Sequence, residues 1–455
     1  MRFVNSLELK DNIECFILIE PGLGYIIPVL REKFKTCKII ALHIGDFPPV
    51  PDSVALQKCD DDDLRKFLEK EVPDTDSKNI RIIEWRPSLK FYGKEYARLL
   101  SLTAEFLKRA DAGRRTTAAF GRRWVRNFFK NLTLIRMAVL FKQAEYPVII
   151  TGSGPGLETA LPVIEKLKDR CLIAAASSSA LALSHMNLSA DFVIATDGGS
   201  WALRHLYPLY RNDLNTGLLA VNLCAALPSQ CTNTPFLIIN DGSFWQSIVL
   251  NALGLPSVIV TQKGTVSATA VELAMTLTKG NIYLAGIDLC VNDIRTHARP
   301  YAFDFILAQN ECRFTPVYSQ SFTRSSLLKA GGSMDIYASW FKNQLSSWPK
   351  RIFSLGGSHE VFETSLPTEK SVLKNSREYF KIVNANEDPA LFCKRGAEAL
   401  LDAFDDSRYC ENLRRELAPL LFPGENSVEN SELKAAITQI ADCYASADTA
   451  KDAHE

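Results

Sequence analysis

Short apolar runs separated by helix-length segments dominate the middle of the chain. Between residues 147 and 290 these runs are Val148–Thr151, Cys171–Ala175, Phe192–Thr196, Leu218–Val221, Phe236–Asn240, Ser257–Thr261 and Ile282–Ala285. A run that is apolar throughout is typical of a strand buried on both faces, and its alternation with helices is typical of a parallel sheet. The pattern therefore predicts an α/β fold with a Rossmann-like, mostly parallel central sheet.

The first part of the chain shows the same alternation on a smaller scale. Two β-rich runs, at residues 15–19 and 37–42, flank a segment from Tyr25 to Lys35 that can form one helix. Pro28 is tolerated there because it lies near the first helical turn. This order predicts a βαβ unit, and we expect a small α/β domain over residues 1–93.

Charge marks two helical segments. The acidic stretch Asp60–Asp63 precedes a helical pattern at 64–71, where acids favour the helix N-terminus. Over residues 94–146 the pattern indicates a helical connector without strands. Between Lys108 and Lys130 there is a single acid, Asp111, against the basic residues Lys108, Arg109, Arg114, Arg115, Arg122, Arg123, Arg126 and Lys130. Such a helix could hold an anionic substrate or a partner, or it could simply present a solvated charged face.

The rest of the chain divides into two further regions. We expect a central nucleotide-sugar-binding domain over residues 147–345, and a C-terminal region over 346–455 that is mixed at first and helical from about Pro389. A chain of 455 residues is long enough for two or three domains.

Composition narrows the classes of function. Lys+Arg and Asp+Glu are 52 each, so overall charge offers no argument for a nucleic-acid partner. The eleven cysteines form no CxxC pair and no zinc-like spacing. Residues 1–14 contain no stretch of signal-peptide length, and no segment is apolar enough to span a membrane. We expect a cytoplasmic protein without a membrane or nucleic-acid partner.

The clearest chemical signal is a glycine-rich turn. The strand at 148–151 leads into Gly152-Ser153-Gly154-Pro155-Gly156-Leu157, and a helical pattern follows. Glycines at this place let backbone N–H groups approach a phosphate at the positive end of the helix. Tight strand-to-helix turns also use glycine for steric reasons, so both interpretations stay open. No Gly-Lys-Ser/Thr follows, which disfavours a P-loop.

Polar residues recur where later strands end. Ser177 and Asp197 follow two of them, and in parallel sheets ligands collect at this edge. The segment Gly264–Ser267 opens a helix of small residues and offers backbone amides and hydroxyls as a second anion site. Asp288 follows the strand at 282–285, and His297 comes nine positions after it as a candidate base. Taken singly, each residue could equally cap a helix or order a loop.

Four motifs follow one another in a recognisable order. They are the GSGPGL turn at 152–157, SADFVIATD at 189–197, KGTVSATAVELA at 263–274, and GIDLC at 286–290 followed by Thr296-His297-Ala298. This order resembles the central domain of the motility accessory factor (Maf) family of flagellin glycosyltransferases. More loosely, the segments Pro21–Tyr25, Phe120–Leu132, Tyr337–Phe341 and Ser354–Gly357 also resemble that family, so the likeness extends over most of the chain.

The resemblance implies a glycosyltransferase with a sialyltransferase-like central domain. In the family, a nonulosonic acid such as pseudaminic or legionaminic acid is thought to pass from its CMP-activated form to Ser or Thr of flagellin. It implies flagellin and a nucleotide-sugar as partners, with no cofactor besides the CMP-sugar donor. Because no DxD-like pair follows a strand in this sequence, we expect no metal either. The nucleotide would be bound by Gly152, Ser153, Gly154, Pro155, Gly156, Leu157, Ser177 and Asp197, its phosphate or the sugar carboxylate by Gly264, Thr265, Val266 and Ser267, and the reacting end by Asp288 and His297.

Two other functions remain open from the sequence. The same central domain is also similar to 6-hydroxymethylpterin diphosphokinase, which would transfer diphosphate from ATP and require Mg²⁺. A non-catalytic flagellin-binding assembly factor would keep the partner surface and tolerate loss of Gly154, Asp288 and His297.

Overall fold

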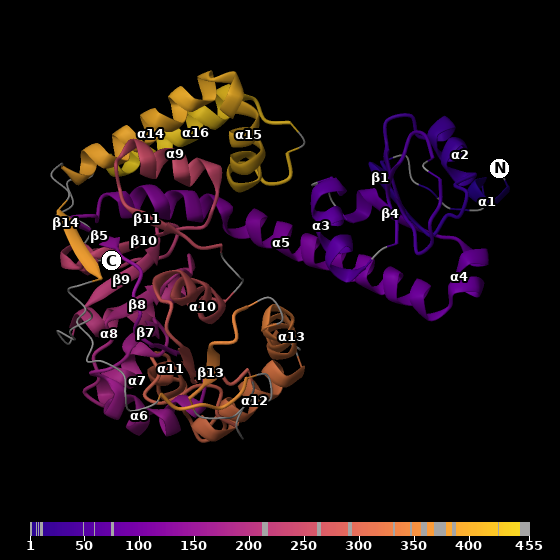
Figure 1. Ribbon diagram of the computed structural model, residues 1–455. Helices are drawn as coiled ribbons and strands as arrows, with labels where there is room; N and C mark the ends of the chain where they lie inside the picture. Colours follow the sequence, from indigo (N-terminus) through magenta and orange to yellow (C-terminus); the bar gives the residue numbers. More distant parts are fainter. Residues whose placement is uncertain are drawn as a thin grey trace. The chain divides into compact units, whose positions relative to one another are not determined.

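The computed structural model divides into two compact units, Met1–Ala119 and Phe120–Glu455, and each is described by itself. The helix α5 (Lys94–Leu132) contributes its first part to unit 1 and its last part to unit 2 (Figure 1). The structure describes residues 2–5, 7, 9, 12–48, 50–58, 60–73, 77–211, 217–261, 265–289, 294–330, 333–345, 348–355, 362–367, 379–384, 388–425 and 427–445.

Unit 1 is built on a parallel sheet in the order β3-β2-β1-β4. Its strands are β1 (Cys15–Ile19), β2 (Lys38–Leu42), β3 (Val54–Leu56) and β4 (Ile80–Glu84), and its helices besides α5 are α1 (Arg2–Asn5), α2 (Ile26–Lys33), α3 (Asp61–Glu71), η1 (Ser77–Asn79) and α4 (Arg86–Tyr92). Because β1 and β2 are parallel and joined through α2, the predicted βαβ unit is confirmed. The acidic stretch also acts as predicted, since the Asp60 carboxylate accepts the Asp63 N–H (2.7 Å) at the start of α3.

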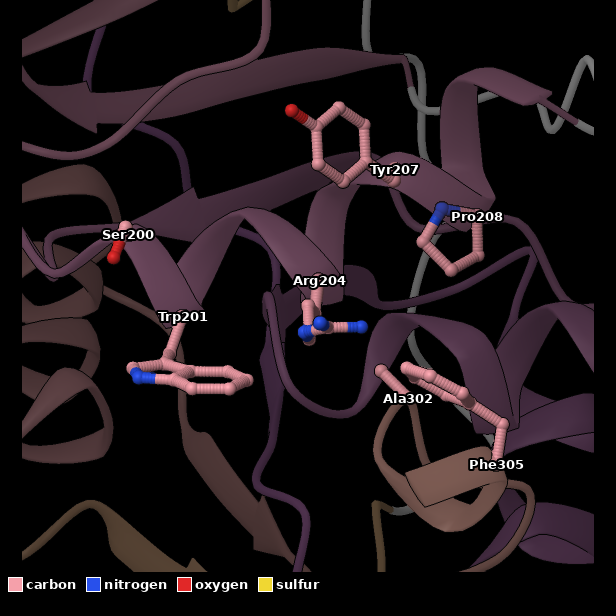
Figure 2. Close-up of a pocket in the computed structure, with 7 residues that line it drawn as sticks. All are labelled: Ser200, Trp201, Arg204, Tyr207, Pro208, Ala302 and Phe305. Carbon is pink, nitrogen blue, oxygen red and sulfur yellow. The ribbon is translucent and has the colours of Figure 1, made fainter. Parts of the chain in front are cut away.

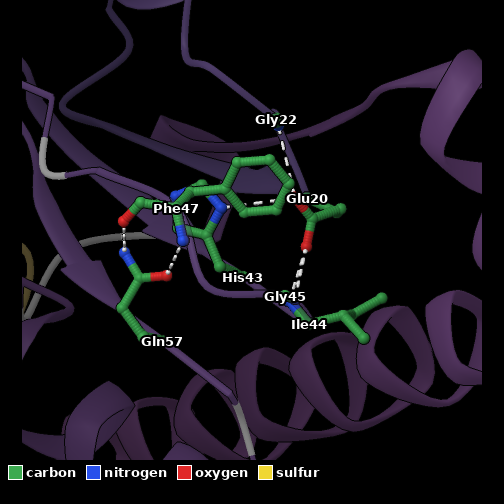
Figure 3. Close-up of polar contacts among 7 residues, drawn as sticks. All are labelled: Glu20, Gly22, His43, Ile44, Gly45, Phe47 and Gln57. Atoms are coloured by element: carbon green, nitrogen blue, oxygen red, sulfur yellow. Dashed lines mark hydrogen bonds and ion pairs between the residues drawn. The ribbon is translucent and has the colours of Figure 1, made fainter.

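A buried carboxylate organises the carboxyl end of β1 (Figure 3). Glu20 Oε2 accepts the N–H groups of Ile44 (2.5 Å) and Gly45 (3.3 Å). Its Oε1 accepts the Gly22 N–H and lies 3.3 Å from His43 Nδ1. Burial alone would raise the pKa of Glu20, but the hydrogen bonds from His43, Ile44 and Gly45 lower it below its usual value. The carboxylate therefore connects the turn after β1 to the loop after β2.

Unit 2 contains, among the described residues, a ten-stranded sheet in the order β13-β12-β6-β7-β8-β9-β10-β5-β14, with β11 also paired to β10. All pairs are parallel except β14 with β5. The strands are β5 (Met137–Phe141), β6 (Val148–Thr151), β7 (Leu172–Ala176), β8 (Phe192–Ala195), β9 (Leu218–Asn222), β10 (Phe236–Asn240), β11 (Ser257–Ile259), β12 (Ile282–Ala285), β13 (Ile352–Ser354) and β14 (Phe380–Asn384). The seven strands expected between residues 147 and 290 are confirmed within two residues at their ends.

Both faces of this sheet are buried, as its apolar runs predict. Ile149 and Ile173 belong to one hydrophobic core, whereas Val148, Ile150 and Leu172 belong to the other. Successive side chains of a strand point to opposite faces, so each strand needs an apolar residue at every position. This explains why the runs are continuous and do not alternate with polar residues.

Unit 2 also contains helices, several of which cover these two faces. They are α6 (Gly156–Leu167), α7 (Ala180–His185), η2 (Ser200–Ala202), α8 (Leu203–Arg211), η3 (Ser229–Asn233), α9 (Phe244–Ala252), α10 (Val266–Leu277), α11 (Asp304–Gln309), α12 (Val317–Ala330), α13 (Ser333–Leu345), α14 (Pro389–Asp405), α15 (Ser407–Leu421) and α16 (Asn430–Ala445). The last three confirm the helical C-terminal region. Their buried residues, such as Phe392, Leu413 and Leu433, pack with Val249 of α9 in one core, and they lie beside α9 in Figure 1.

One sequence prediction is wrong at the end of the connector. The helical pattern was expected to continue through residues 94–146 without strands, but α5 ends at Leu132 and residues 137–141 form β5. This strand pairs in parallel with β10 and antiparallel with β14. A five-residue apolar run has the same local pattern in a strand and in a buried helix turn, so only its partners decide. In the part of the chain that is described, no helix has the length and apolar character needed to cross a membrane.

Candidate functional site

The order of strands in unit 2 reverses beside β6. From β6 the sheet continues through β7 and β8 on one side, whereas β12, which comes later in the chain, pairs with β6 on the other side. In open α/β sheets a ligand binds outside the carboxyl ends of the strands at such a reversal. The turn after β6 and the segment after β12 therefore mark the candidate site.

The glycine-rich turn and the end of β12 approach each other through their backbones. The Gly152 N–H donates to the Ala285 carbonyl (2.8 Å), and the Gly154 N–H donates to the Gly286 carbonyl (2.7 Å). A Cβ at Gly152 would lie 2.5 Å from the Gly286 oxygen, and Gly286 itself has φ +64°. The fold thus requires glycine at these positions for steric reasons, and the N–H groups of Gly152 and Gly154 are already bonded.

Asp288 occupies the start of α6. Its side chain is buried, and Oδ2 accepts the Gly156 N–H at 2.5 Å. A Cβ at Gly154 would lie 2.5 Å from the same oxygen. A carboxylate at a helix N-terminus is stabilised by the helix dipole and stands where a phosphate would otherwise bind. The structure therefore gives Asp288 a capping contact, and a phosphate has to be bound by other groups of the site.

Hydroxyl groups remain available at the same edge. Ser153 lies between the bonded glycines, and neither its N–H nor its hydroxyl has a partner among the described residues. The buried Ser177 follows β7, and its N–H donates to the Ile194 carbonyl (2.9 Å). Next to it, the hydroxyls of Thr151 and Ser179 are 2.8 Å apart and satisfy each other. Pro155 and Leu157, which were predicted as nucleotide contacts, are buried in the turn and in the core.

A loop after β12 is held over the turn. The Ala298 N–H donates to the Ser153 carbonyl (2.8 Å). Glu158, in the first turn of α6, accepts the Arg299 N–H at 3.0 Å and pairs with Arg295 at 2.9 Å. Sequence reasoning missed Glu158, although an acid in the first turn of a helix beside a basic segment is a signal that could have pointed to it.

This loop places His297 in an aromatic environment. The imidazole stacks on the Tyr301 ring with centroids 4.0 Å apart and planes 10° apart, and its Nδ1 lies 2.8 Å from Thr296 Oγ1. Burial, together with the charges of Arg324 and His205, lowers the pKa of His297 to about 3. The imidazole is therefore neutral at pH 7 and can accept a proton or a hydrogen bond.

Two further residues, neither of them predicted from the sequence, lie beside Tyr301. His205 of α8 lies 5.4 Å from its ring and Arg324 of α12 lies 5.9 Å over it. Burial lowers the pKa of His205 to about 4, with Asp197 acting in the opposite direction, and its buried Nδ1 has no partner. Burial raises the pKa of Tyr301, although Arg324 opposes this. Among the described residues, no carboxylate forms an ion pair with Arg324.

The remaining predicted residues have mainly local contacts. Asp197 is exposed after β8, where it accepts the Gly199 N–H (2.8 Å). The Thr265 hydroxyl accepts the Ala268 N–H (3.1 Å) and so caps α10, whose first residues are Val266 and the half-buried Ser267. Gly264 lies outside the described residues. The described residues contain no group of three or more His, Cys, Asp or Glu side chains that could hold a metal ion.

The basic helix α5 supports the site through its polar residues. Its aromatic residues Phe128 and Phe129 are buried in the core, whereas Arg122 is exposed. Asn127 Nδ2 donates to the carbonyls of Gly198 (3.2 Å) and Cys224 (3.0 Å), and Asn131 makes two similar bonds to the loop after β9. The helix thus orders the loops at the carboxyl edge of the sheet.

A cavity of about 680 Å³ opens beside the segments that carry His205 and Tyr301 (Figure 2). It lies between α8 with η2 and the start of α11. Its lining residues are Ser200, Trp201, Arg204, Tyr207, Pro208, Ala302 and Phe305.

Parts of this chain are similar to known proteins. Residues 122–293 match the family model described as 6-hydroxymethylpterin diphosphokinase MptE-like. An uncharacterized protein from Treponema pallidum (strain Nichols) is 27% identical over 286 residues, which make up 61% of this chain and 60% of that protein. The chain thus spans about three fifths of the length of this relative.

A solved structure is similar over a longer part of the chain. The MAf glycosyltransferase from Magnetospirillum magneticum AMB-1 aligns with 95% of this chain and 74% of its own length, with a TM-score of 0.53 and 14% identity. At this identity the likeness establishes the fold. The two matches confirm the resemblance seen in the motifs: the protein has the fold of a Maf glycosyltransferase, and residues 122–293 are similar to the MptE-like family.

Proposed function

We propose that the protein is a glycosyltransferase that passes a nonulosonic, sialic-acid-like sugar from a CMP-activated donor to Ser or Thr of flagellin. The observation that carries this proposal is the meeting of the glycine-rich turn, Asp288 and the His297 loop where the strand order reverses between β6 and β12. The fold shared with a Maf glycosyltransferase supports it. The donor is the one small molecule required, and no nucleic acid, membrane or metal takes part.

The reaction requires a leaving group and a base. The bond between the anomeric carbon and the phosphate oxygen of CMP breaks, and the acceptor hydroxyl attacks that carbon while its proton passes to a base. Groups that stabilise the departing phosphate act where negative charge develops. Candidates are the Ser153 N–H and hydroxyl, the hydroxyls of Ser177 and Ser267, and the Arg324 guanidinium, which has no acidic partner among the described residues.

His297 is the candidate base. A pKa of about 3 makes the imidazole a weak base in this structure, whereas general-base catalysis works best near the operating pH. Part of the shift comes from the charge of Arg324. A donor phosphate or carboxylate beside Arg324 offsets that charge and raises the pKa of His297. Donor binding would thereby activate the base only when there is a sugar to transfer.

Calorimetry with a nucleotide panel tests this function. CMP and a CMP-sugar should bind, while NAD and ATP should not. Ser153→Val is a suitable probe of the turn, because it removes the hydroxyl and leaves the bonded glycines intact. Substitution of Gly154 is less informative, since its Cβ would meet Asp288 and Gly286 and disturb the fold itself. Failure of both CMP ligands to bind would contradict the proposal.

The family match of residues 122–293 favours a second candidate function, diphosphate transfer from ATP to a hydroxymethylpterin. That reaction requires Mg²⁺. If ATP binds tightly with Mg²⁺ while CMP is ignored, this candidate replaces the first. If neither nucleotide binds and flagellin still does, the protein is a non-catalytic assembly factor.

A further inference from the structure

The cavity of about 680 Å³ beside α8 is a candidate binding site in its own right. Its volume falls in the range of about 300–1,000 Å³ that is usual for ligand pockets. Trp201 and Phe305, which line it, are 61% and 41% exposed, so large aromatic surfaces face solvent here. An exposed aromatic surface of this kind around a hollow marks a place where a ligand or partner binds.

Arg204 gives the cavity a specific chemistry. Its guanidinium lies 5.0 Å from the Trp201 ring centroid and 4.8 Å from that of Phe305, between the two rings (Figure 2). No carboxylate among the described residues forms an ion pair with it. Rings that cover the faces of a guanidinium leave its N–H donors at the edge, where their fork matches a carboxylate. The cavity is therefore built to receive a carboxylate next to apolar surface.

The lining also indicates what carries that carboxylate. A sugar acid bears hydroxyls on most of its ring carbons and needs several polar partners. Among the described residues that line the cavity, only Ser200 and Tyr207 offer polar side chains besides Arg204. Trp201, Pro208, Ala302 and Phe305 are better matched by an apolar side chain. A short stretch of polypeptide with an apolar residue beside an acidic one fits this lining.

Exposed aromatics on the elements after the cavity fit a polypeptide partner too. Phe314 is 90% exposed before α12, and Tyr318 and Phe322 of α12 are 65% and 55% exposed. Residues four apart lie on the same face of a helix, so Tyr318 and Phe322 form one aromatic surface. The helix α12 packs against α11, which carries Phe305. A chain segment offers contacts for both surfaces, which a single sugar cannot.

The cavity is connected to the candidate base through ring contacts. Trp201 lies 6.1 Å from Phe303, Phe303 lies 5.5 Å from Tyr301, and Tyr301 stacks on His297 at 4.0 Å. Two rings, those of Phe303 and Tyr301, thus separate a segment bound against Trp201 from His297.

We propose that the Trp201–Arg204–Phe305 cavity binds the acceptor polypeptide through an acidic side chain adjacent to an apolar one. It thereby selects which Ser or Thr is presented to His297. The binding of the peptide stands by itself, whereas its role as acceptor rests on the proposed glycosyl transfer.

Two blocked peptides test the proposal with the full-length protein. One contains leucine, serine and aspartate in succession, and the other has asparagine in place of the aspartate. Fluorescence anisotropy of the labelled peptides should show the aspartate peptide binding about tenfold tighter or more, since a charge-assisted hydrogen bond is lost in the other. Arg204→Gln should bring the two affinities together, and Trp201→Leu should weaken both. Arg415→Gln, an exposed arginine of α15, is the matched control and should keep the preference.

CMP binding by the same samples separates this inference from the proposed function. If CMP binds and wild type does not distinguish the peptides, the cavity proposal is overturned and the proposed function stands. If wild type prefers the aspartate peptide but does not bind CMP, the cavity proposal stands and the proposed function fails. Binding of N-acetylneuraminic acid that depends on Arg204, without binding of either peptide, would assign the cavity to a sugar acid and overturn the peptide proposal.

Discussion

Both units of the protein place a glycine-containing turn directly after a strand, β1 in unit 1 and β6 in unit 2, and in both a carboxylate bonds that turn. In unit 1 Glu20 accepts the Gly22 N–H, and in unit 2 Asp288 accepts the Gly156 N–H. The difference lies in the surrounding charges. The buried His43 of unit 1 is paired with Glu20, whereas His297 of unit 2 lies near Arg324 and makes no described bond to an acid. A glycine-rich turn therefore does not by itself mark a site, and uncompensated charge near it is the better indicator.

The largest effect should come from His297, the histidine that has no acidic partner in the described part of the chain. His297→Ala should lower sugar transfer by about 10²–10⁴-fold, because a positioned general base contributes that much. Binding of CMP should change little, since Ser153 and Ser177 remain. Initial rates with purified acceptor and calorimetry on the same sample check this. Unchanged transfer would remove His297 from the mechanism.

The paired carboxylate of unit 1 should matter for stability and not for binding. Glu20→Ala leaves buried N–H groups and His43 without their acceptor, which should lower the free energy of unfolding of unit 1 by about 3–5 kcal/mol. Binding of CMP by unit 2 should persist at temperatures where unit 2 is folded. Denaturant titration measures the first effect. Glu32→Ala, an exposed acid on α2, is the control that should change stability little.

The two units should also respond differently to acid. His205 and His297 have pKa values lowered to about 4 and 3, so the unfolded chain binds more protons below its own histidine pKa of about 6.5. Unit 2 should therefore lose stability as the pH falls below about 6.5, by up to about 1.4 kcal/mol per pH unit for each histidine. The lowered pKa of Glu20 gives unit 1 stability that is present above the unfolded value of about 4.3 and is lost as the pH falls through the folded value.

Calorimetric scans between pH 7 and pH 4.5 distinguish these responses. Only the transition of unit 2 should move to lower temperature in this window. In a variant with both His205→Phe and His297→Phe the shift should be much smaller. Equal shifts of both transitions in wild type would contradict the contrast drawn between the units.

The smallest effect concerns the turn itself. Ser153→Ala should weaken CMP binding by about three- to tenfold, the value of one hydrogen bond of about 0.5–1.5 kcal/mol. Thr276→Ala, in the last turn of α10, removes an exposed hydroxyl at a distance from the candidate site and should leave the affinity unchanged. Titration calorimetry with CMP compares the two variants. An unchanged affinity in Ser153→Ala would show that the turn only shapes the site.

The sequence by itself determined the fold class, the order of motifs and most strands. Continuous apolar runs such as Phe236–Asn240 can be satisfied only by burial on both faces, so their local pattern already specifies a central parallel strand. The same holds for the cap at Asp60, because a helix start is decided within a few residues. The short run at 137–141 was misassigned because its partners β10 and β14 lie far away in the chain.

The candidate site depended on the tertiary structure to a greater degree. Asp288 and Gly156 are 132 positions apart, and no spacing rule could show that the carboxylate already bonds the turn it was expected to leave open for a phosphate. Arg204 and Arg324 belong to no sequence motif. They became informative only when folding placed them against Trp201 and Tyr301 with no ion-paired acid among the described residues. Pairing and burial of charge arise from contacts between distant segments, and that is why they could be read only from the folded chain.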